Sequence, residues 1–347
     1  MTHPDPAAAL LDGYYADADA LVSRGVASAA HVDTSMRLGA GYAAGPFAAR
    51  GIAVGDAAET DSGTETPWSK VAVLGTGRMA TGIAEAIARA GGDVVVVARS
   101  EASAARSNAD LSASLDRSVA RGRLSAEDAA ATMRRTSFVP SLSALPPVDL
   151  VVEAVAEDLA VKQTLMVELD RTLAPAVPIA TNTSSYRVAE VMSRVGPDRP
   201  VLALHFFNPA PAMRLVEIIP GPHSAHLVPL AEAWVRSLRK TPVRSADERG
   251  FIVNRLLIPY LNDAVRLHES GISIELIDES LVAEAGVPMG PFALIDLIGL
   301  DVTVAALSSM AETSIDERLR PAATLHAHIA AGRLGRKSGA GFYREGE

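Results

Sequence analysis

Cysteine is absent from the 347 residues of this chain. Its absence excludes disulfide bonds, thiolate metal ligands and a cysteine nucleophile, and it favours the cytoplasmic location that we expect. The N-terminal stretch MTHPDPAAALLDGYYADADA lacks a basic segment followed by an apolar one, so no signal peptide is predicted. No uncharged apolar run approaches the roughly 20 residues that span a bilayer. We therefore expect no membrane segment, and we predict no metal site.

Positive charge is also scarce. The formal net charge is −9 at pH 7, and the pI is near 5.4. Nucleic acids and anionic membrane surfaces require clustered cations, so neither is an expected partner, whereas a local basic pocket for a phosphate is compatible with this balance. Hydrophobic residues make up 48% of the chain and charged residues 21%. This composition is typical of a globular protein, and the length predicts two domains or one large domain with attachments.

The pattern of apolar residues predicts four segments. Residues 1–53 are predicted as an N-terminal helical extension and 54–67 as a polar linker. Residues 68–248 alternate short apolar runs with helical stretches, which predicts a Rossmann-like, doubly wound α/β domain. Residues 249–347 lose the strand-like runs and are predicted as an all-helical C-terminal domain. The predicted strands are 71–74, 94–98, 150–152, 179–180, 201–204 and 215–219, and the predicted helices are 80–90, 101–134, 158–173, 251–270 and 273–285.

The N-terminal extension resembles part of the C-terminal domain. Residues 16–47 parallel residues 262–292 with one insertion, and a Gly-Pro-Phe turn closes both segments. A chance match between alanine-rich segments is the alternative, but the shared turn favours duplication. The extension is therefore predicted to form a related helical hairpin. The matched residues are Gly25 with Gly271, Asp33 with Asp278, and Gly45-Pro46-Phe47 with Gly290-Pro291-Phe292.

A glycine-rich turn lies between the first predicted strand and the following helix. Its first glycine permits a tight turn, its second lets a pyrophosphate approach the backbone, and a small third residue allows the helix to pack closely on the strand. The helix N-terminus offers backbone N–H groups to the anion. This context predicts dinucleotide binding, with a purely structural turn as the alternative. The turn consists of Gly75, Thr76, Gly77, Arg78, Met79 and Ala80.

The end of the second predicted strand bears on the choice between NAD and NADP. NAD sites usually place an acidic residue there to hold the ribose hydroxyls. Here Ala98, Arg99 and Ser100 follow a run of valines, and no carboxylate occurs before Glu101. An arginine and a hydroxyl suit a 2′-phosphate, so NADP is predicted as the preferred cofactor and NAD as the second choice. A merely solvated Arg99 is the alternative.

Three motifs, TNTSS at 181–185, HFFNP at 205–209 and GFIVNR at 250–255, occur in an order that resembles the L-3-hydroxyacyl-CoA dehydrogenases of fatty-acid β-oxidation and butanoate metabolism. The resemblance covers about residues 70–347, including the tail GRKSGAGFY. It implies reversible oxidation of an (S)-3-hydroxyacyl thioester, with a short-chain acyl-CoA as the default substrate. It also implies a homodimer that pairs through the helical domain.

The resemblance implies a catalytic set of His205, Glu217, Ser184 and Asn254. A neutral histidine suits removal of a hydroxyl proton, and His205 ends a predicted strand, where open α/β sheets bind ligands. Glu217 lies within the apolar run LVEII, where a charge is costly unless paired, and its implied role is to orient and stabilise the histidine. Ser184 and Asn254 are implied to bind the substrate oxygen and to position the thioester. A structural histidine and an outward-facing Glu217 are the alternatives.

Six further residues take implied binding roles. Asn208, Glu157, Lys162 and Lys337 match cofactor contacts, whereas Ser114 and Arg121, two helical turns apart, match contacts to coenzyme A. For Glu157 with Lys162 the alternative is an ordinary surface helix pair, and for Lys337 and Arg121 it is a solvated side chain.

Two rival functions stay open. One keeps the enzyme class but changes the substrate to a hydroxyacyl group on a carrier protein or to a free hydroxy or sugar acid. The other is a catalytically silent nucleotide-binding or structural protein. The complete set of Ser184, His205, Glu217 and Asn254 argues against silence, because a protein that only binds a nucleotide does not require all four.

Overall fold

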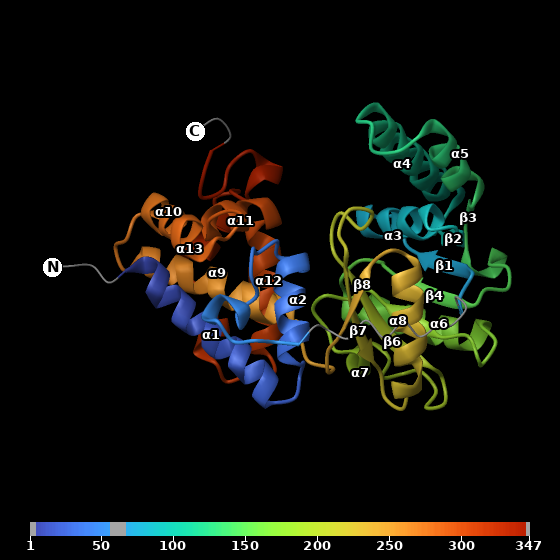
Figure 1. Cartoon of the computed structure of the whole chain (residues 1–347). Helices are drawn as coiled ribbons and strands as arrows, with labels where there is room; N and C mark the ends of the chain where they lie inside the picture. Colours follow the sequence, from blue (N-terminus) through green and yellow to red (C-terminus); the bar gives the residue numbers. More distant parts are fainter. Residues whose placement is uncertain (1–4, 56–66, 345–347) are drawn as a thin grey trace. The chain divides into compact units, whose positions relative to one another are not determined.

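The computed structural model describes residues 5–55 and 67–344. The chain divides into two compact units, one formed by Met1–Ala58 with Glu248–Glu347 and the other by Glu59–Asp247 (Figure 1). The N-terminal extension thus belongs to the same unit as the C-terminal helices. Of the predicted linker 54–67, residues 56–66 lie outside the described residues.

Unit Glu59–Asp247 contains a single sheet in its described part, with the strand order β3-β2-β1-β4-β5-β6-β7-β8. All neighbouring strands are parallel except β6 and β7, which are antiparallel. The strand order reverses between β1 and β4, and ligands of doubly wound sheets bind at such a point, at the carboxyl ends of the strands. The strands are β1 Lys70–Leu74, β2 Asp93–Val97, β3 Thr136–Val139, β4 Leu150–Glu153, β5 Ile179–Thr181, β6 Val201–Phe206, β7 Leu215–Pro220 and β8 Thr241–Arg244.

The helices of this unit correct one prediction. The single helix predicted over 101–134 is two helices, because Gly122 has a φ of 65° and the Ser125 hydroxyl accepts a hydrogen bond from the N–H of Asp128 and starts a new helix. The helices are α3 Arg78–Arg89, α4 Glu101–Ala120, α5 Ala126–Arg134, α6 Leu159–Thr172, α7 Val188–Val191 and α8 Val228–Ser237, with 3₁₀ turns at Leu142–Ala144 and Ala225–Leu227.

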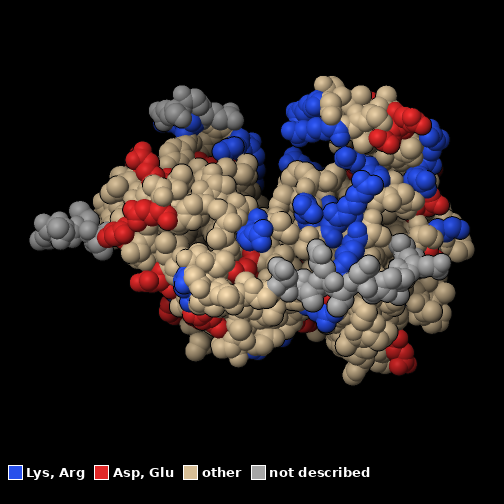
Figure 2. Space-filling view, in the orientation of Figure 1, with Lys and Arg blue, Asp and Glu red and all other residues tan. Residues whose placement is uncertain are grey.

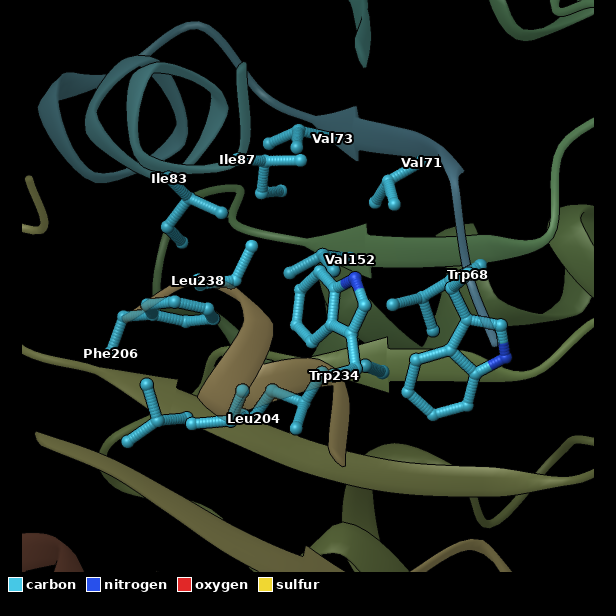
Figure 3. Close-up of a cluster of buried hydrophobic side chains, with 14 of the residues drawn as sticks. Trp68, Val71, Val73, Ile83, Ile87, Val152, Leu204, Phe206, Trp234 and Leu238 are labelled. Atoms are coloured by element: carbon cyan, nitrogen blue, oxygen red, sulfur yellow. The ribbon is translucent and has the colours of Figure 1, made fainter. Parts of the chain in front are cut away.

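A hydrophobic core holds α3 and α8 against one face of the sheet (Figure 3). The buried positions of α3 include Ala80, Ile83, Ala84 and Ile87, a spacing that places them on one helical face. Trp234 of α8 meets other aromatic rings edge-on, with ring centroids 5.8 Å from Trp68 and 6.4 Å from Phe206. This packing fixes the start of α3, and with it the glycine-rich turn, relative to β1.

The other unit is helical in its described part, and the predicted N-terminal hairpin is present as α1 and α2 (Figure 1). Among the described helices none alone has the length and hydropathy of a membrane span, and α11 and α12 reach them only together, across a bend of 94°. The helices are α1 Pro6–Ser23, α2 Ala29–Gly39, α9 Val253–Glu269, α10 Ile274–Ala285, α11 Pro291–Ile298, α12 Leu300–Ala311 and α13 Ala323–Ala330, with 3₁₀ turns at Ala48–Arg50, Glu317–Leu319 and Arg336–Ser338.

Candidate active site

His205 and Glu217 form a buried pair near the carboxyl end of β6. They lie directly opposite each other in the antiparallel ladder of β6 and β7, so their side chains share one face of the sheet. Nδ1 of His205 is 2.6 Å from Oε2 of Glu217, and the two residues are 5% and 0% exposed. The structure therefore brings together the two residues that were predicted as a dyad. The alternative of an outward-facing Glu217 is therefore wrong.

Neighbouring residues hold this histidine in place. The ring of Phe207 packs against the imidazole, with centroids 4.5 Å apart. Asn182, just after β5, accepts a hydrogen bond from the backbone N–H of Phe206 at 2.8 Å. That bond joins the loop after β5 to the end of β6. Asn182 lies within the TNTSS motif but was not predicted as a site residue.

The glycine-rich turn follows β1 at the reversal of the strand order. Gly75 has a φ of 122°, and a Cβ atom there would lie 2.5 Å from the carbonyl oxygen of Ala154, so a side chain is excluded. At Gly77, by contrast, a Cβ atom would meet no other atom within 4 Å, so the glycine keeps the turn open to an incoming group. No side chain of the described residues caps α3, whose first turn begins at Arg78 and includes Met79 and the fully buried Ala80. Thr76 completes the turn, and these features fit a dinucleotide pyrophosphate.

Arg99 and Ser100 follow β2, as predicted, but the structure separates their roles. The Ser100 hydroxyl is the N-cap of α4: it accepts from the N–H of Ser103 at 3.2 Å, and it lies 3.0 Å from the Ser103 hydroxyl. Arg99 is exposed. Ser100 is thus engaged in starting the helix, and the predicted role of Arg99 toward a 2′-phosphate stays a prediction.

Lys162 is buried in an ion-pair network that also includes the exposed Glu157, rather than lying on the surface of a helix. Lys162 is 1% exposed, and its Nζ lies 2.7 Å from Oε1 of Glu153 and 3.1 Å from Oε2 of Glu157. Glu153 ends β4 with 0% exposure and also accepts from the hydroxyl of Thr181 at 2.6 Å. The surface-pair alternative is therefore wrong. Glu157 lies before the start of α6, and Lys162 lies on its buried face.

Glu157 organises the loop that carries Ser184. Its Oε1 accepts from the Thr183 hydroxyl at 2.6 Å, from the Ser184 N–H at 2.9 Å and from the Ser185 N–H at 3.0 Å. Burial by itself would raise the pKa of Glu157, but the ammonium of Lys162 and the donors of this loop outweigh burial and lower the pKa. The carboxylate therefore stays charged and holds Ser184 beside the end of β5.

Asn254 and Lys337 lie in the helical unit. Asn254 is in the first turn of α9. Lys337 places its Nζ 2.5 Å and 2.6 Å from the two carboxylate oxygens of Asp301. This exposed ion pair is the contact that the structure provides for Lys337, whose predicted role toward the cofactor stays a prediction.

A groove of about 450 Å³ runs between α3, α4 and the loop that begins at Asn208. Ser114 and Arg121 both line it, as their shared helical face predicts, but the Ser114 hydroxyl donates to Glu85 at 2.8 Å and so ties α4 to α3. Lys and Arg side chains gather over this part of the molecule (Figure 2), although the whole chain is acidic. The arginines that line the groove are Arg78, Arg89, Arg117, Arg121 and Arg123.

Sequence reasoning missed Glu153 and most of these arginines. Glu153 carried the same signal as Glu217, a carboxylate within or ending an apolar strand. Arg117 lies four residues before Arg121 and three after Ser114, which is the spacing of one helical face. No cluster of three or more His, Asp or Glu side chains suited to a metal ion occurs within residues 5–55 and 67–344.

Comparison with known proteins finds family matches on both sides of residue 249. Residues 70–248 match the family described as 3-hydroxyacyl-CoA dehydrogenase, NAD binding domain, and residues 250–345 match its C-terminal domain. The chain is 38% identical over 278 residues to a 3-hydroxybutyryl-CoA dehydrogenase of Mycobacterium tuberculosis, covering 79% of this chain and 97% of that one. It resembles the crystal structure of (S)-3-hydroxybutyryl-CoA dehydrogenase from Ralstonia eutropha with a TM-score of 0.77, 35% identity, and coverage of 81% and 100%. The dehydrogenase part of a multifunctional enzyme from Caenorhabditis elegans matches over 92% of this chain and 70% of its own, with a TM-score of 0.57 and 25% identity.

Proposed function

The chain belongs to the 3-hydroxyacyl-CoA dehydrogenase family, and from this membership we propose that His205 and Glu217 catalyse the reversible oxidation of a short-chain (S)-3-hydroxyacyl-CoA. The observation that carries the proposal is the buried pair itself, a histidine and a carboxylate 2.6 Å apart at the end of a strand of a doubly wound sheet. The protein is a nicotinamide-dependent oxidoreductase.

The pair performs the proton transfer. Glu217 accepts a hydrogen bond from Nδ1 of His205, which leaves Nε2 as the nitrogen that takes the hydroxyl proton during oxidation and returns it during reduction. The carboxylate stabilises the imidazolium that results, and burial strengthens that attraction. Asn182 and Phe207 keep the strand end and the ring in position for this transfer.

The glycine-rich turn fits a nicotinamide dinucleotide, which when bound would supply the acceptor or donor of the hydride. The open space at Gly77 and the uncapped N-terminus of α3 are suited to its pyrophosphate. Glu157 and Lys162 support the loop of Ser184, so their role toward the cofactor is one of positioning. Ser184 and Asn254 are proposed to bind the thioester and its 3-oxygen.

The arginine-lined groove is proposed to hold the coenzyme A end of the substrate. Coenzyme A carries several phosphate charges, and arginine binds phosphate through paired, charge-assisted hydrogen bonds. Arg117 of α4 and Arg121 at the C-cap of α4 line the groove, and Arg78 lines it at the start of α3. The groove also reaches Asn208, in the loop that follows the catalytic strand.

A substrate panel tests the proposed reaction. Loss of nicotinamide fluorescence is recorded with 3-oxoacyl-CoA of several chain lengths, with the same acyl groups on a carrier protein, and with free 3-oxo acids. The highest kcat/KM is expected with the short CoA thioesters. A preference for the carrier protein or the free acid would transfer the proposal to that substrate, and no turnover with any of them would favour a catalytically silent protein.

Glu217→Gln is expected to change the pH dependence of the reaction. Without the anion, the imidazolium that forms during oxidation is less stable. The acid limb of the kcat/KM profile for oxidation should therefore move to lower pH. A profile identical to that of the wild type would place Glu217 outside the proton transfer.

Arg121→Ala is expected to weaken binding of CoA thioesters. One lost charge-assisted hydrogen bond costs about 1.5–3 kcal/mol, so kcat/KM should fall roughly 10- to 150-fold. A truncated pantetheine thioester lacks the phosphates and should show no such loss. Arg106→Ala is the matched control, because Arg106 is an exposed residue of the same helix outside the groove. Equal losses in both variants would contradict the assignment.

NADP is proposed as the preferred cofactor because Arg99, with no acid before Glu101, follows β2. A higher kcat/KM is expected with NADPH than with NADH. Arg99→Ala should weaken NADPH alone, by about 1.5–3 kcal/mol. Wild-type preference for NADH contradicts the proposal, and an equal loss with both cofactors would assign Arg99 to a part that they share.

A cytoplasmic location is proposed on the absence of cysteine, and cell fractionation tests it. The homodimer predicted from the sequence stays a prediction. The packing of the N-terminal hairpin against α9 and α10 argues against a homodimer.

A further inference from the structure

The N-terminal hairpin and the α9–α10 segment are built in the same way. In the hairpin, the Asp33 carboxylate accepts hydrogen bonds from the N–H groups of Phe47 and Ala48, both at 2.9 Å. In the other segment, Asp278 accepts from Phe292 at 2.9 Å and from Ala293 at 3.1 Å. In both segments, a Cβ atom on the glycine of the Gly-Pro-Phe turn would collide with the aspartate.

Helix starts and stops agree as well. α1 and α9 are each followed by a glycine with positive φ, and α2 and α10 are each capped by a serine hydroxyl that accepts a backbone N–H at 3.2 Å. The helix caps, the turns and the aspartate hydrogen bonds agree between the two segments, as expected of a duplicated unit. The described structure therefore contains the repeat that the sequence indicated. The equivalent residues are Gly25 with Gly271 and Ser28 with Ser273.

The two copies pack with equivalent residues facing each other. Tyr14 and Tyr260 precede Gly25 and Gly271 by the same number of residues, and their rings lie 5.8 Å apart. A residue that meets its own equivalent marks a two-fold axis, as in an isologous dimer interface. α1 packs along α9 and α10 in this way (Figure 1).

Arg318 lies on the same approximate axis. Asp17 and Asp263 are equivalent positions of the two copies, and both bind this one guanidinium, at 2.9 Å from Nη1 and 2.5 Å from Nη2. A single side chain thus bridges the two copies symmetrically.

We propose that the N-terminal hairpin takes the place that a second copy of α9–α10 would take in a two-fold dimer, and that the protein is therefore a monomer. Tyr14, Leu21 and Tyr260 are 2%, 1% and 2% exposed, so this face is fully covered. A tethered segment acts at an effective concentration of about millimolar, which a second chain at micromolar concentration does not match.

The hairpin also contacts the segment before α9 through an exposed ion pair. Nη2 of Arg24, at the end of α1, lies 3.1 Å from Oε2 of Glu248, shortly before Asn254.

Sedimentation velocity of the full chain gives the first test. A single species of 36.2 kDa is expected across the concentration range of the assay. A species of twice that mass overturns the proposal, whatever the enzyme activity.

The chain has no cysteine, so cysteines can be introduced without interference. Asp17→Cys with Asp263→Cys should be joined within one chain by a short bismaleimide, and peptide mapping identifies the link. Asp263→Cys alone should give no joined chains, as should Asp17→Cys alone. A link between chains through the single Asp263→Cys, or no internal link in the double variant, contradicts the proposal.

Tyr14→Asp buries a charge at the centre of the contact, and Ala16→Asp places the same charge on the exposed face of α1 as a matched control. Tyr14→Asp should release the hairpin and double the mass, because the α9–α10 faces of two chains then pair. Ala16→Asp should stay a monomer. A Tyr14→Asp variant of wild-type mass overturns the proposal.

Discussion

His205→Gln should lower kcat about 10²- to 10⁴-fold relative to the wild type. The affinity for the nicotinamide cofactor should stay unchanged. Glutamine keeps a polar side chain near Glu217 but cannot take up a proton, so the loss reports the chemical step. The glycine-rich turn belongs to β1 and α3 and does not depend on the ring of His205. Turnover is measured with saturating substrate, and cofactor affinity by titration of nicotinamide fluorescence.

His226→Gln is the control for this variant, because His226 is an exposed histidine of the same unit. It should retain wild-type turnover. A His205→Gln enzyme with more than about a tenth of the wild-type kcat would contradict the role of His205 as the general acid/base.

Lys162→Met should lower the free energy of unfolding by about 3–5 kcal/mol. The ammonium lies between the carboxylates of Glu153 and Glu157, and its removal leaves Glu153, which is 0% exposed, with a buried and uncompensated charge. Methionine nearly preserves the volume, so the effect reports charge rather than packing. Urea denaturation, followed by circular dichroism, measures the change.

Two further variants test whether the buried charge causes the loss of stability in Lys162→Met. Lys162→Met with Glu153→Gln should recover part of the loss, because the buried charge is then removed as well. Lys337→Met removes an ion pair whose side chains are 46% and 42% exposed, and it should cost less than about 1 kcal/mol. Equal losses in the two single variants would mean that burial of Lys162 does not determine the effect.

Much of the sheet was predictable because central parallel strands are apolar on both faces and read as continuous runs. The runs at β1, β2, β4, β5, β6 and β7 were predicted for that reason. The terminal strands β3, Thr136–Val139, and β8, Thr241–Arg244, were missed. Both lie at an edge of the sheet and are only partly buried, so their sequences carry no apolar run, and β8 contains a proline that an edge strand tolerates.

The sequence by itself determined the glycine-rich turn, the helical copy at the N-terminus and the residue types of the site, because each depends on local backbone freedom or on a recognisable order of motifs. Only the tertiary structure decided which of these residues meet. The pairing of His205 with Glu217 depends on the register of β6 with β7, and a shift of one residue would place Glu217 on the opposite face. The burial of Lys162 and the meeting of Tyr14 with Tyr260 depend on how whole elements pack, and no spacing along the chain records that packing.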